Sequence, residues 1–176
     1  MAPERFFLEL TPPTELLRNA AHVVIVGGGF AGLKAAHARA GKTVRVTLID
    51  KRNFNLFQPL LYQVASGLVS QTDVASPLRI MLGQAPNVQI LMGEVDDIDT
   101  SAQEVIFNDR RLHYNHLIVA AGATSSFFGH DEWAAFAPGL KTLEDAFEIR
   151  RRVLFAFESA EKEPDPEKRQ HWLTLC

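Results

Sequence analysis

The stretch VVIVGGGFAGLKAA, residues 23–36, runs from four aliphatic residues through three consecutive glycines into residues that favour a helix. The aliphatic run is rich in β-branched side chains, which is typical of a strand buried on both faces of a sheet. Gly27, Gly29 and Gly32 have the G-x-G-x-x-G spacing of a turn that holds a dinucleotide pyrophosphate. In such a turn the first glycine permits the tight bend, the second leaves room for the phosphates, and the third lets the helix pack closely on the strand.

A second strand that ends in an acidic residue completes this pattern. We expect strands over residues 22–27 and 43–50 and a helix over residues 30–40, which together form a βαβ unit. Asp50 ends the second strand 18 residues after Gly32, where a carboxylate can accept both hydrogen bonds of an adenosine ribose. The sequence therefore predicts an α/β fold that binds a dinucleotide at a helix N-terminus, where free N–H groups and the helix dipole favour an anion.

The rest of the chain continues the α/β pattern with an inserted antiparallel segment. Residues 53–72 carry no charge, and their amides favour a buried loop that faces a polar ligand over a membrane helix. Residues 73–83 are expected to form a short helix with Asp73 as its cap and a proline in its first turn. Short strands over residues 87–122 predict a β-meander that returns to a parallel strand. Residues 142–163 have the apolar spacing of one long amphipathic helix.

Composition excludes several classes of function. With 18 basic and 21 acidic residues the net charge is −3, so no broad cationic surface favours nucleic acid as a partner. Cys176 is the only cysteine, which excludes an internal disulfide, a Cys-based zinc site and a dithiol redox pair. His113 and His116 fall in the expected meander next to a strand, and Asp96, Asp97 and Asp99 lack calcium-loop spacing, so no metal site is predicted. We find no pattern of catalytic side chains, and the expected partner is a small molecule.

The glycine motif and Asp50 leave NAD and FAD open, because both molecules present an ADP half to the same turn. The order of the following segments favours a flavin. In a simple NAD domain the third parallel strand follows quickly, whereas here an uncharged loop, a short helix and a meander precede HLIVAAGAT, residues 116–124.

Several longer stretches carry a family resemblance: VVIVGGGFAGL, VTLIDKRNFNLFQPLLYQVASGLVS, DVASPLR, HLIVAAGAT and FFGHDEWAAFAPGLKTLEDAFEIRRRVLFAFE. Over residues 20–176 the chain resembles the N-terminal part of type II NADH:quinone oxidoreductases, within the FAD-dependent pyridine nucleotide-disulfide oxidoreductase superfamily. The resemblance implies a Rossmann-like FAD-binding domain with a central parallel sheet and a β-meander. It assigns the pyrophosphate contacts to Gly27, Gly29, Phe30, Ala31 and Gly32, and the adenosine ribose to Asp50. The adenine side is assigned to Lys51, Arg52 and Val95. The flavin contacts are assigned to Ala121, Gly122 and Gln58, and Gln58 belongs to a segment, residues 58–62, that would approach the flavin ring.

The resemblance also implies a reaction. Hydride would pass from NADH to FAD, and two electrons would then pass to a quinone, with the flavin in place of any catalytic side chain. Disulfide reductases carry a redox-active cysteine pair after the second strand, whereas this chain has FNLFQPLLYQ there, so relay through thiols is excluded.

The same resemblance divides the chain into parts. It implies a leader (1–19), an FAD-binding domain (20–142), a long helix with a charged linker (143–170) and the first strand of a truncated NADH-binding domain (171–176). A chain of this extent is expected to be inactive by itself. Peripheral membrane association, on the cytoplasmic side of the inner membrane, is expected only of the complete protein, and an exposed interdomain face could drive homodimerisation.

Other interpretations remain open from sequence. A related flavoprotein reductase of the sulfide:quinone or ferredoxin type, or an NAD dehydrogenase with an unusual insertion, would carry the same glycine motif. A non-catalytic dinucleotide-binding module would also carry it.

Overall fold

The computed structural model describes residues 17, 19–83 and 85–174. The expected leader, residues 1–19, therefore lies outside the described residues except for Leu17 and Asn19. The chain divides into two compact units, and neither is continuous in sequence. The sheet unit consists of Met1–Asn55 and Pro77–Gly122, and the helical unit consists of Leu56–Ser76 and Ala123–Cys176.

The chain passes from the sheet unit to the helical unit and back through two short strands. These are β3 (Phe54–Leu56) and β4 (Ala75–Pro77), which pair with each other in a two-stranded sheet.

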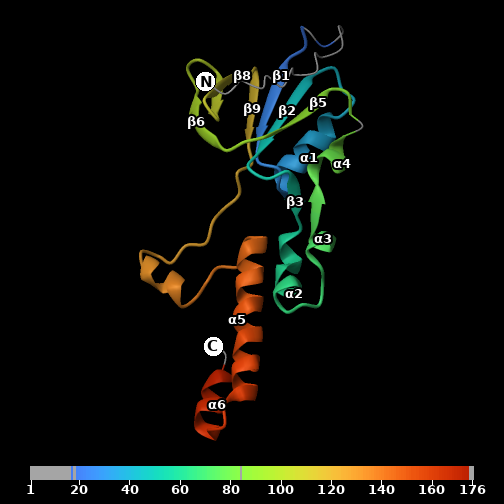
Figure 1. Ribbon diagram of the computed structural model, residues 1–176. Coiled ribbons are helices and arrows are strands. Elements are labelled where there is room, and N and C mark those ends of the chain that lie inside the picture. The colour runs from blue at the N-terminus through green and yellow to red at the C-terminus, as the bar shows by residue number, and fades with distance from the viewer. Residues whose placement is uncertain (1–16, 18, 84, 175–176) are drawn as a thin grey trace, which may run out of the picture. The chain divides into compact units, whose positions relative to one another are not determined.

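A four-stranded parallel sheet forms the centre of the sheet unit (Figure 1). Its order is β5-β2-β1-β9, and the strands are β1 (His22–Val26), β2 (Arg45–Asp50), β5 (Val88–Met92) and β9 (His116–Val119). All three pairings are parallel, with Val26 opposite both Ile49 and Val119. The predicted α/β class, the first two strands and the parallel return after the meander are confirmed.

Both faces of this sheet are covered, which explains why β1 is aliphatic from Val23 to Val26. On one face, α1 (Phe30–Arg39) and α4 (Leu78–Leu82) pack on alternate strand residues, including Val23 and Ile25. On the other face, Val24 and Val26 pack against the meander strands β6 (Val95–Asp99), β7 (Glu104–Phe107) and β8 (Arg110–His113). Because successive side chains of a strand point to opposite faces, a doubly covered strand favours apolar residues along its length. The exception is His22 at the start of β1, whose buried ring is hydrogen-bonded to His113 O and Thr47 Oγ1.

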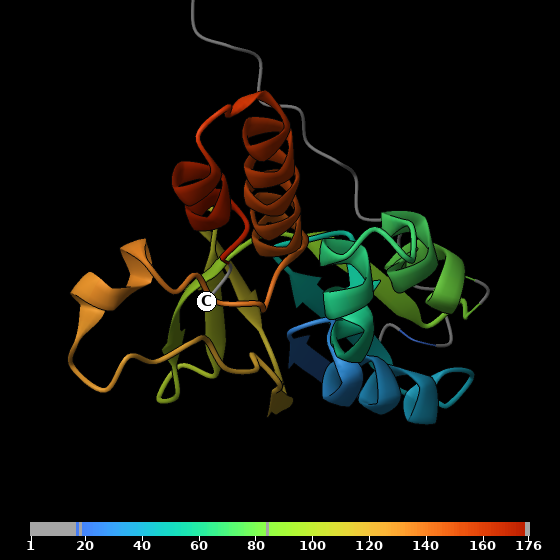
Figure 2. The ribbon, with the colours of Figure 1, turned by 90° about the horizontal axis from the view of Figure 1, so that it is seen from below.

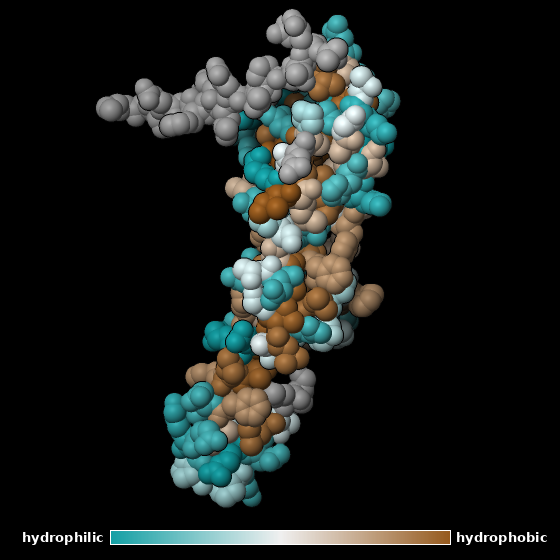
Figure 3. All heavy atoms as spheres, turned by 90° about the vertical axis from the view of Figure 1, so that its right-hand side faces the viewer, coloured by the Kyte–Doolittle hydropathy of each residue, from teal (hydrophilic) through white to brown (hydrophobic). Residues whose placement is uncertain are grey.

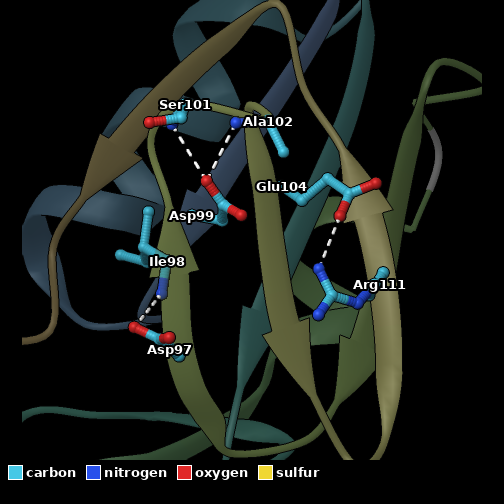
Figure 4. Close-up of polar contacts among 7 residues, drawn as sticks. All are labelled: Asp97, Ile98, Asp99, Ser101, Ala102, Glu104 and Arg111. Carbon is cyan, nitrogen blue, oxygen red and sulfur yellow. Dashed lines mark hydrogen bonds and ion pairs between the residues drawn. The ribbon is translucent and has the colours of Figure 1, made fainter.

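Polar contacts within the meander shape its turns (Figure 4). Asp99 ends β6, and its Oδ1 accepts hydrogen bonds from the N–H groups of Ser101 (3.0 Å) and Ala102 (2.9 Å). Arg111 donates to Glu104 at 3.0 Å across the antiparallel pair β7–β8. The acidic residues of this segment therefore include a turn-forming aspartate.

The short helix predicted over residues 73–83 is wrong as a single element. The structure has α3 (Gln71–Val74), then β4, then α4. Asp73 is not the N-cap: Ser70 is, and the two residues form a reciprocal capping box. Pro77 explains the break, because its ring disfavours helical backbone in the preceding residue.

The helical unit is built around one long helix, α5 (Leu143–Lys162), as the apolar spacing predicts. Thr142 caps it, accepting from Asp145 N at 3.1 Å while the Asp145 carboxylate accepts from Thr142 N at 2.8 Å. The unit also contains η2 (Gln58–Leu60), α2 (Leu61–Ala65), α3 and η3 (Asp131–Ala135). Apolar side chains remain on the surface along these helices, where Figure 3 is brown.

The uncharged segment, residues 53–72, is buried only in part. Asn55, Leu61, Val64 and Ala65 are buried, whereas Leu68 is 77% exposed and no residue of 66–72 is buried, so the expected buried loop is wrong for residues 66–72. The alternation follows from α2, which presents Leu61 and Val64 to the interior of the helical unit.

A second helix occupies most of the segment expected to be a charged linker and the start of a strand. This is α6 (Pro166–Trp172), which lies beside α5 (Figure 2), with the Phe155 and Trp172 rings edge to face at 5.9 Å. Asp165 caps it by accepting from the N–H of Glu167 at 2.9 Å. The expected strand over residues 171–176 is therefore wrong for residues 171–174, of which the first two are helical and the other two irregular, and residues 175–176 lie outside the described part of the chain.

Candidate functional site

The glycine turn begins where β1 ends, at the carboxyl edge of the sheet. Gly27 donates its N–H to Ile49 O at 2.8 Å and has a φ of +104°, a conformation that L-residues with side chains rarely adopt. A Cβ at this position would also overlap the carbonyl oxygen of Ala120. Gly27 therefore lets the ends of β1, β2 and β9 approach one another.

The other two motif glycines differ in what surrounds them. A Cβ on Gly32 would overlap the Gly27 carbonyl oxygen, whereas a Cβ on Gly29 would meet no atom within 4 Å. Gly29, Phe30 and Ala31 are exposed, and the first turn of α1 contains no acidic residue. The first N–H groups of a helix lack partners within it, so this end of α1 can accept an anion.

The carboxylate of Asp50 lies against the glycine turn. Its Oδ2 accepts from Gly28 N at 2.5 Å and its Oδ1 accepts from Arg52 N at 2.7 Å. Because an ionised carboxylate offers about four lone-pair sites, it can accept further hydrogen bonds from a ligand. The side chain is half-buried, so one side remains accessible.

Asn55 also contacts the turn, although the sequence analysis did not identify it. Its amide Nδ2 donates to Gly28 O at 2.9 Å, and the side chain is buried, with 6% exposed. No spacing signal marks this residue, because its partner lies 27 positions earlier in the chain.

Lys51 and Arg52 follow Asp50 at the same edge. Lys51 is exposed and forms an ion pair with Glu94 at 3.7 Å. Arg52 is half-buried, and its guanidinium lies 5.8 Å from the centre of the Phe54 ring. The two cations are therefore next to the predicted ribose-binding carboxylate.

The last predicted positions in the sheet unit flank this edge. Val95 begins β6 shortly after β5, is half-buried and packs against the core beneath the meander. Gly93, between them, donates its N–H to Asp50 O at 2.9 Å. Ala121 and Gly122 are exposed and follow β9, and Gly122 has a φ of +76°.

Gln58 belongs to the helical unit, where it begins η2 and is half-buried. The adjoining Tyr62 lines a pocket of about 520 Å³ between α2 and α5, together with Leu140, Val153 and Leu154. Arg150 and Ser66 also line the pocket, which therefore combines a mostly apolar wall with one cationic side chain.

No group of three or more His, Cys, Asp or Glu side chains is placed to hold a metal ion in residues 17, 19–83 and 85–174. No helix in this part of the chain has the length and apolar character to cross a membrane.

A parallel sheet covered on both faces, with a glycine turn, a helix N-terminus and a strand-terminal aspartate at its carboxyl edge, defines a Rossmann-like domain of the dinucleotide-binding class. The family model described as pyridine nucleotide-disulphide oxidoreductase matches residues 21–154. The chain belongs to this family.

Within this family, the chain is similar to type II NADH:quinone oxidoreductases. The type II NADH:quinone oxidoreductase Ndh of Mycobacterium tuberculosis is 46% identical over 167 residues, which are 93% of this chain and 36% of the relative. NdhA of the same organism, also named a type II NADH:quinone oxidoreductase, is 50% identical over 157 residues, 87% of this chain and 33% of the relative. Among solved structures, NDH2 of Plasmodium falciparum in complex with NADH matches with a TM-score of 0.74 and 27% identity, over 82% of this chain and 30% of that one. The chain spans about a third of the length of the curated relatives it matches.

Proposed function

We propose that this chain binds FAD at the carboxyl edge of its parallel sheet and provides the FAD-binding part of an NADH:quinone oxidoreductase. The observation that carries the proposal is the contact of the Asp50 carboxylate with Gly28 N, directly beside the exposed N-terminus of α1. An anion-binding helix end next to a ribose-binding carboxylate suits the ADP half of a dinucleotide. The names of the two mycobacterial relatives support the reaction.

Each predicted residue has a proposed contact. The N–H groups of Gly29, Phe30 and Ala31 would hold the pyrophosphate, with Gly27 and Gly32 shaping the turn, and Asp50 would accept from the ribose hydroxyls. In the remaining contacts, Lys51, Arg52 and Val95 would line the adenine side, and Ala121, Gly122 and Gln58 would contact the flavin. The open space at Gly29 fits a phosphate that approaches the backbone closely.

The choice of FAD over NAD for this site rests on the segment order. The meander strands β6, β7 and β8 are inserted between β5 and β9, as expected of a flavoprotein rather than of a simple NAD domain. When bound, FAD would supply the redox chemistry, taking hydride from NADH and delivering two electrons to a quinone, which takes up two protons to become a quinol. The protein's own groups would bind and orient the cofactor.

The same proposal covers the partners, membrane association, domains and oligomeric state of the complete protein. NADH and a quinone would be the partners of the complete protein, which would associate peripherally with the cytoplasmic face of the inner membrane. Residues 20–142 would form the FAD-binding domain, with the NADH-binding domain following it. Homodimerisation is a further expectation, and analytical ultracentrifugation of the chain with and without FAD tests it.

Parallel titrations of the flavin-free chain with FAD and with NADH, followed by calorimetry and flavin fluorescence, test the cofactor. We expect FAD binding and no NADH binding at this site. Asp50→Asn should weaken FAD binding about tenfold, because the amide loses the charge and one acceptor that a ribose hydroxyl needs. Asp109→Asn, the same change at an exposed turn, should leave the affinity unchanged. NADH binding without FAD binding would instead support a nicotinamide site.

A further inference from the structure

The peptide groups on either side of Gly28 are held by two different side chains. On the N-terminal side the Gly28 N–H donates to Asp50 Oδ2 at 2.5 Å. On the C-terminal side the Gly28 carbonyl accepts from Asn55 Nδ2 at 2.9 Å. Gly28 thus has both of its backbone polar groups paired with side chains, one at the end of β2 and one in β3, and its orientation is fixed relative to the end of β2.

This orientation matters for the next peptide group. The Gly28 carbonyl shares its peptide plane with the Gly29 N–H, so a bond that directs the carbonyl inward directs the N–H to the opposite side. Gly29 is exposed and precedes α1, where the phosphate-binding N–H groups begin. Without the Asn55 bond this peptide could rotate, because both flanking residues are glycines.

Packing does not explain an asparagine at this position. Asn is disfavoured in strands, yet Asn55 lies at the centre of β3 and is 6% exposed. Burying an amide without a hydrogen bond is destabilising, so a buried Asn is expected where a bond is required. An aliphatic residue would fill the same volume without that requirement.

We propose that Asn55 is a positioning residue of the dinucleotide site: it holds the Gly28 carbonyl inward so that the Gly29 N–H faces the pyrophosphate. This inference rests on the proposed function, since it assumes FAD at the turn. Asn55 is not expected to contact the cofactor, and its effect passes through the Gly28–Gly29 peptide.

Substitutions that remove the donor test the proposal. Asn55→Leu keeps the approximate volume, and we expect it to weaken FAD binding to the chain about tenfold. Asn87→Leu is the matched control, because Asn87 is also buried and donates to the carbonyls of Arg39, Lys42 and Val44, away from the glycine turn. It should lower the unfolding temperature without changing the affinity of the folded chain.

Asn55→Asp separates positioning from packing. An ionised carboxylate has no donor for the Gly28 carbonyl, whereas a protonated carboxyl has one, and burial favours the protonated form. The FAD affinity relative to the unsubstituted chain should therefore recover as the pH falls from about 7.5 to about 5.5, whereas Asn55→Leu should show no recovery.

NMR relaxation of the flavin-free chain provides a readout that does not depend on FAD. The ¹H–¹⁵N heteronuclear NOE of Gly29, whose N–H shares a peptide group with the Gly28 carbonyl, should fall in Asn55→Leu, while the NOE values of β1 and α1 stay the same. An unchanged NOE at Gly29, or an unchanged FAD affinity in Asn55→Leu, would overturn the inference. If the unsubstituted chain binds no FAD, the proposed function fails, and the NOE result still decides whether Asn55 holds the turn.

Discussion

Gly29 and Gly32 are three positions apart in one motif, yet their substitution by alanine should have opposite consequences. A Cβ at Gly32 would overlap the Gly27 carbonyl and lie 3.4 Å from Ile25 Cγ2. A Cβ at Gly29 would extend into open space, and the backbone there, with φ −73° and ψ −166°, is one that alanine adopts freely. We predict that Gly32→Ala damages the fold and that Gly29→Ala damages the site.

The loss of stability expected for Gly32→Ala follows from what the new Cβ would meet. That atom is the Gly27 carbonyl oxygen, which belongs to the backbone and cannot rotate away as a side chain could. Overpacking of this kind costs about 3 kcal/mol, and the higher helix propensity of alanine offsets about 1 kcal/mol of that. The net loss is about 2 kcal/mol, which lowers the urea midpoint by about 1 M for a slope of about 2 kcal/mol per M.

For Gly29→Ala two small effects oppose each other. Alanine is a poorer N-cap than glycine, but it restricts the unfolded chain and so stabilises the fold by about 0.4–1 kcal/mol. The midpoint should therefore stay within about 0.3 M of the parent. The new methyl group would occupy the space through which a phosphate approaches the backbone, so FAD affinity should fall about tenfold.

The assay pairs urea denaturation of the flavin-free chain, followed by circular dichroism, with FAD titration of the folded variants. Asn53→Ala, at an exposed position near the same edge, serves as a control and should change neither quantity. Equal midpoints for the two glycine variants would refute the reasoning from the Gly27 carbonyl. Full FAD affinity in Gly29→Ala would refute the phosphate position.

Three further outcomes are expected. Burial and the nearby positive charge of Arg45 lower the pKa of His22 below 6.5, so the unfolded state binds the extra proton more readily than the folded state. The free energy of unfolding should therefore fall as the pH drops below about 6.5. In His22→Gln the urea midpoint should change less between about pH 7.5 and about pH 5 than it does in the parent chain. Thr142→Ala removes the α5 N-cap and should cost about 1 kcal/mol in urea denaturation. Hydrogen bonds from Arg151 and Arg152 lower the pKa of Glu148 to about 2, so the ¹³C chemical shift of its carboxyl group should titrate near that pH. A titration midpoint near 4.5 would contradict the observed pairing.

The parallel sheet and the glycine edge could be predicted because their signals are local. The β-branched run before Gly27 and the strand that ends at Asp50 each fall within a few residues, and parallel pairing then brings their carboxyl ends together. The α6 helix also had a local signal. Asp165 followed by Pro166 is a helix start, but the charge of this segment favoured the interpretation as a linker.

The division of the short helix before β5 was harder to predict, because Ser70 and Asp73 are both good caps. Position in the capping box decides between them: a residue three places before an acidic residue can form the reciprocal pair. The proline then ends the first piece, since the residue before it prefers extended backbone. A reading that gave the capping box more weight than the lone aspartate would have found α3.

Asn55 had no local signal, because what requires it is a carbonyl 27 residues earlier. A polar residue at the centre of a buried strand nevertheless implies that some backbone or side-chain group needs its hydrogen bond. Asn87 obeys the same rule, since its side chain accepts from Gly41 N and donates to the carbonyls of Arg39, Lys42 and Val44 at and after the end of α1. In a chain of this fold, buried asparagines therefore indicate which turns of the backbone the fold must hold, and the turn held at Gly28 is the one that would face FAD under the proposed function.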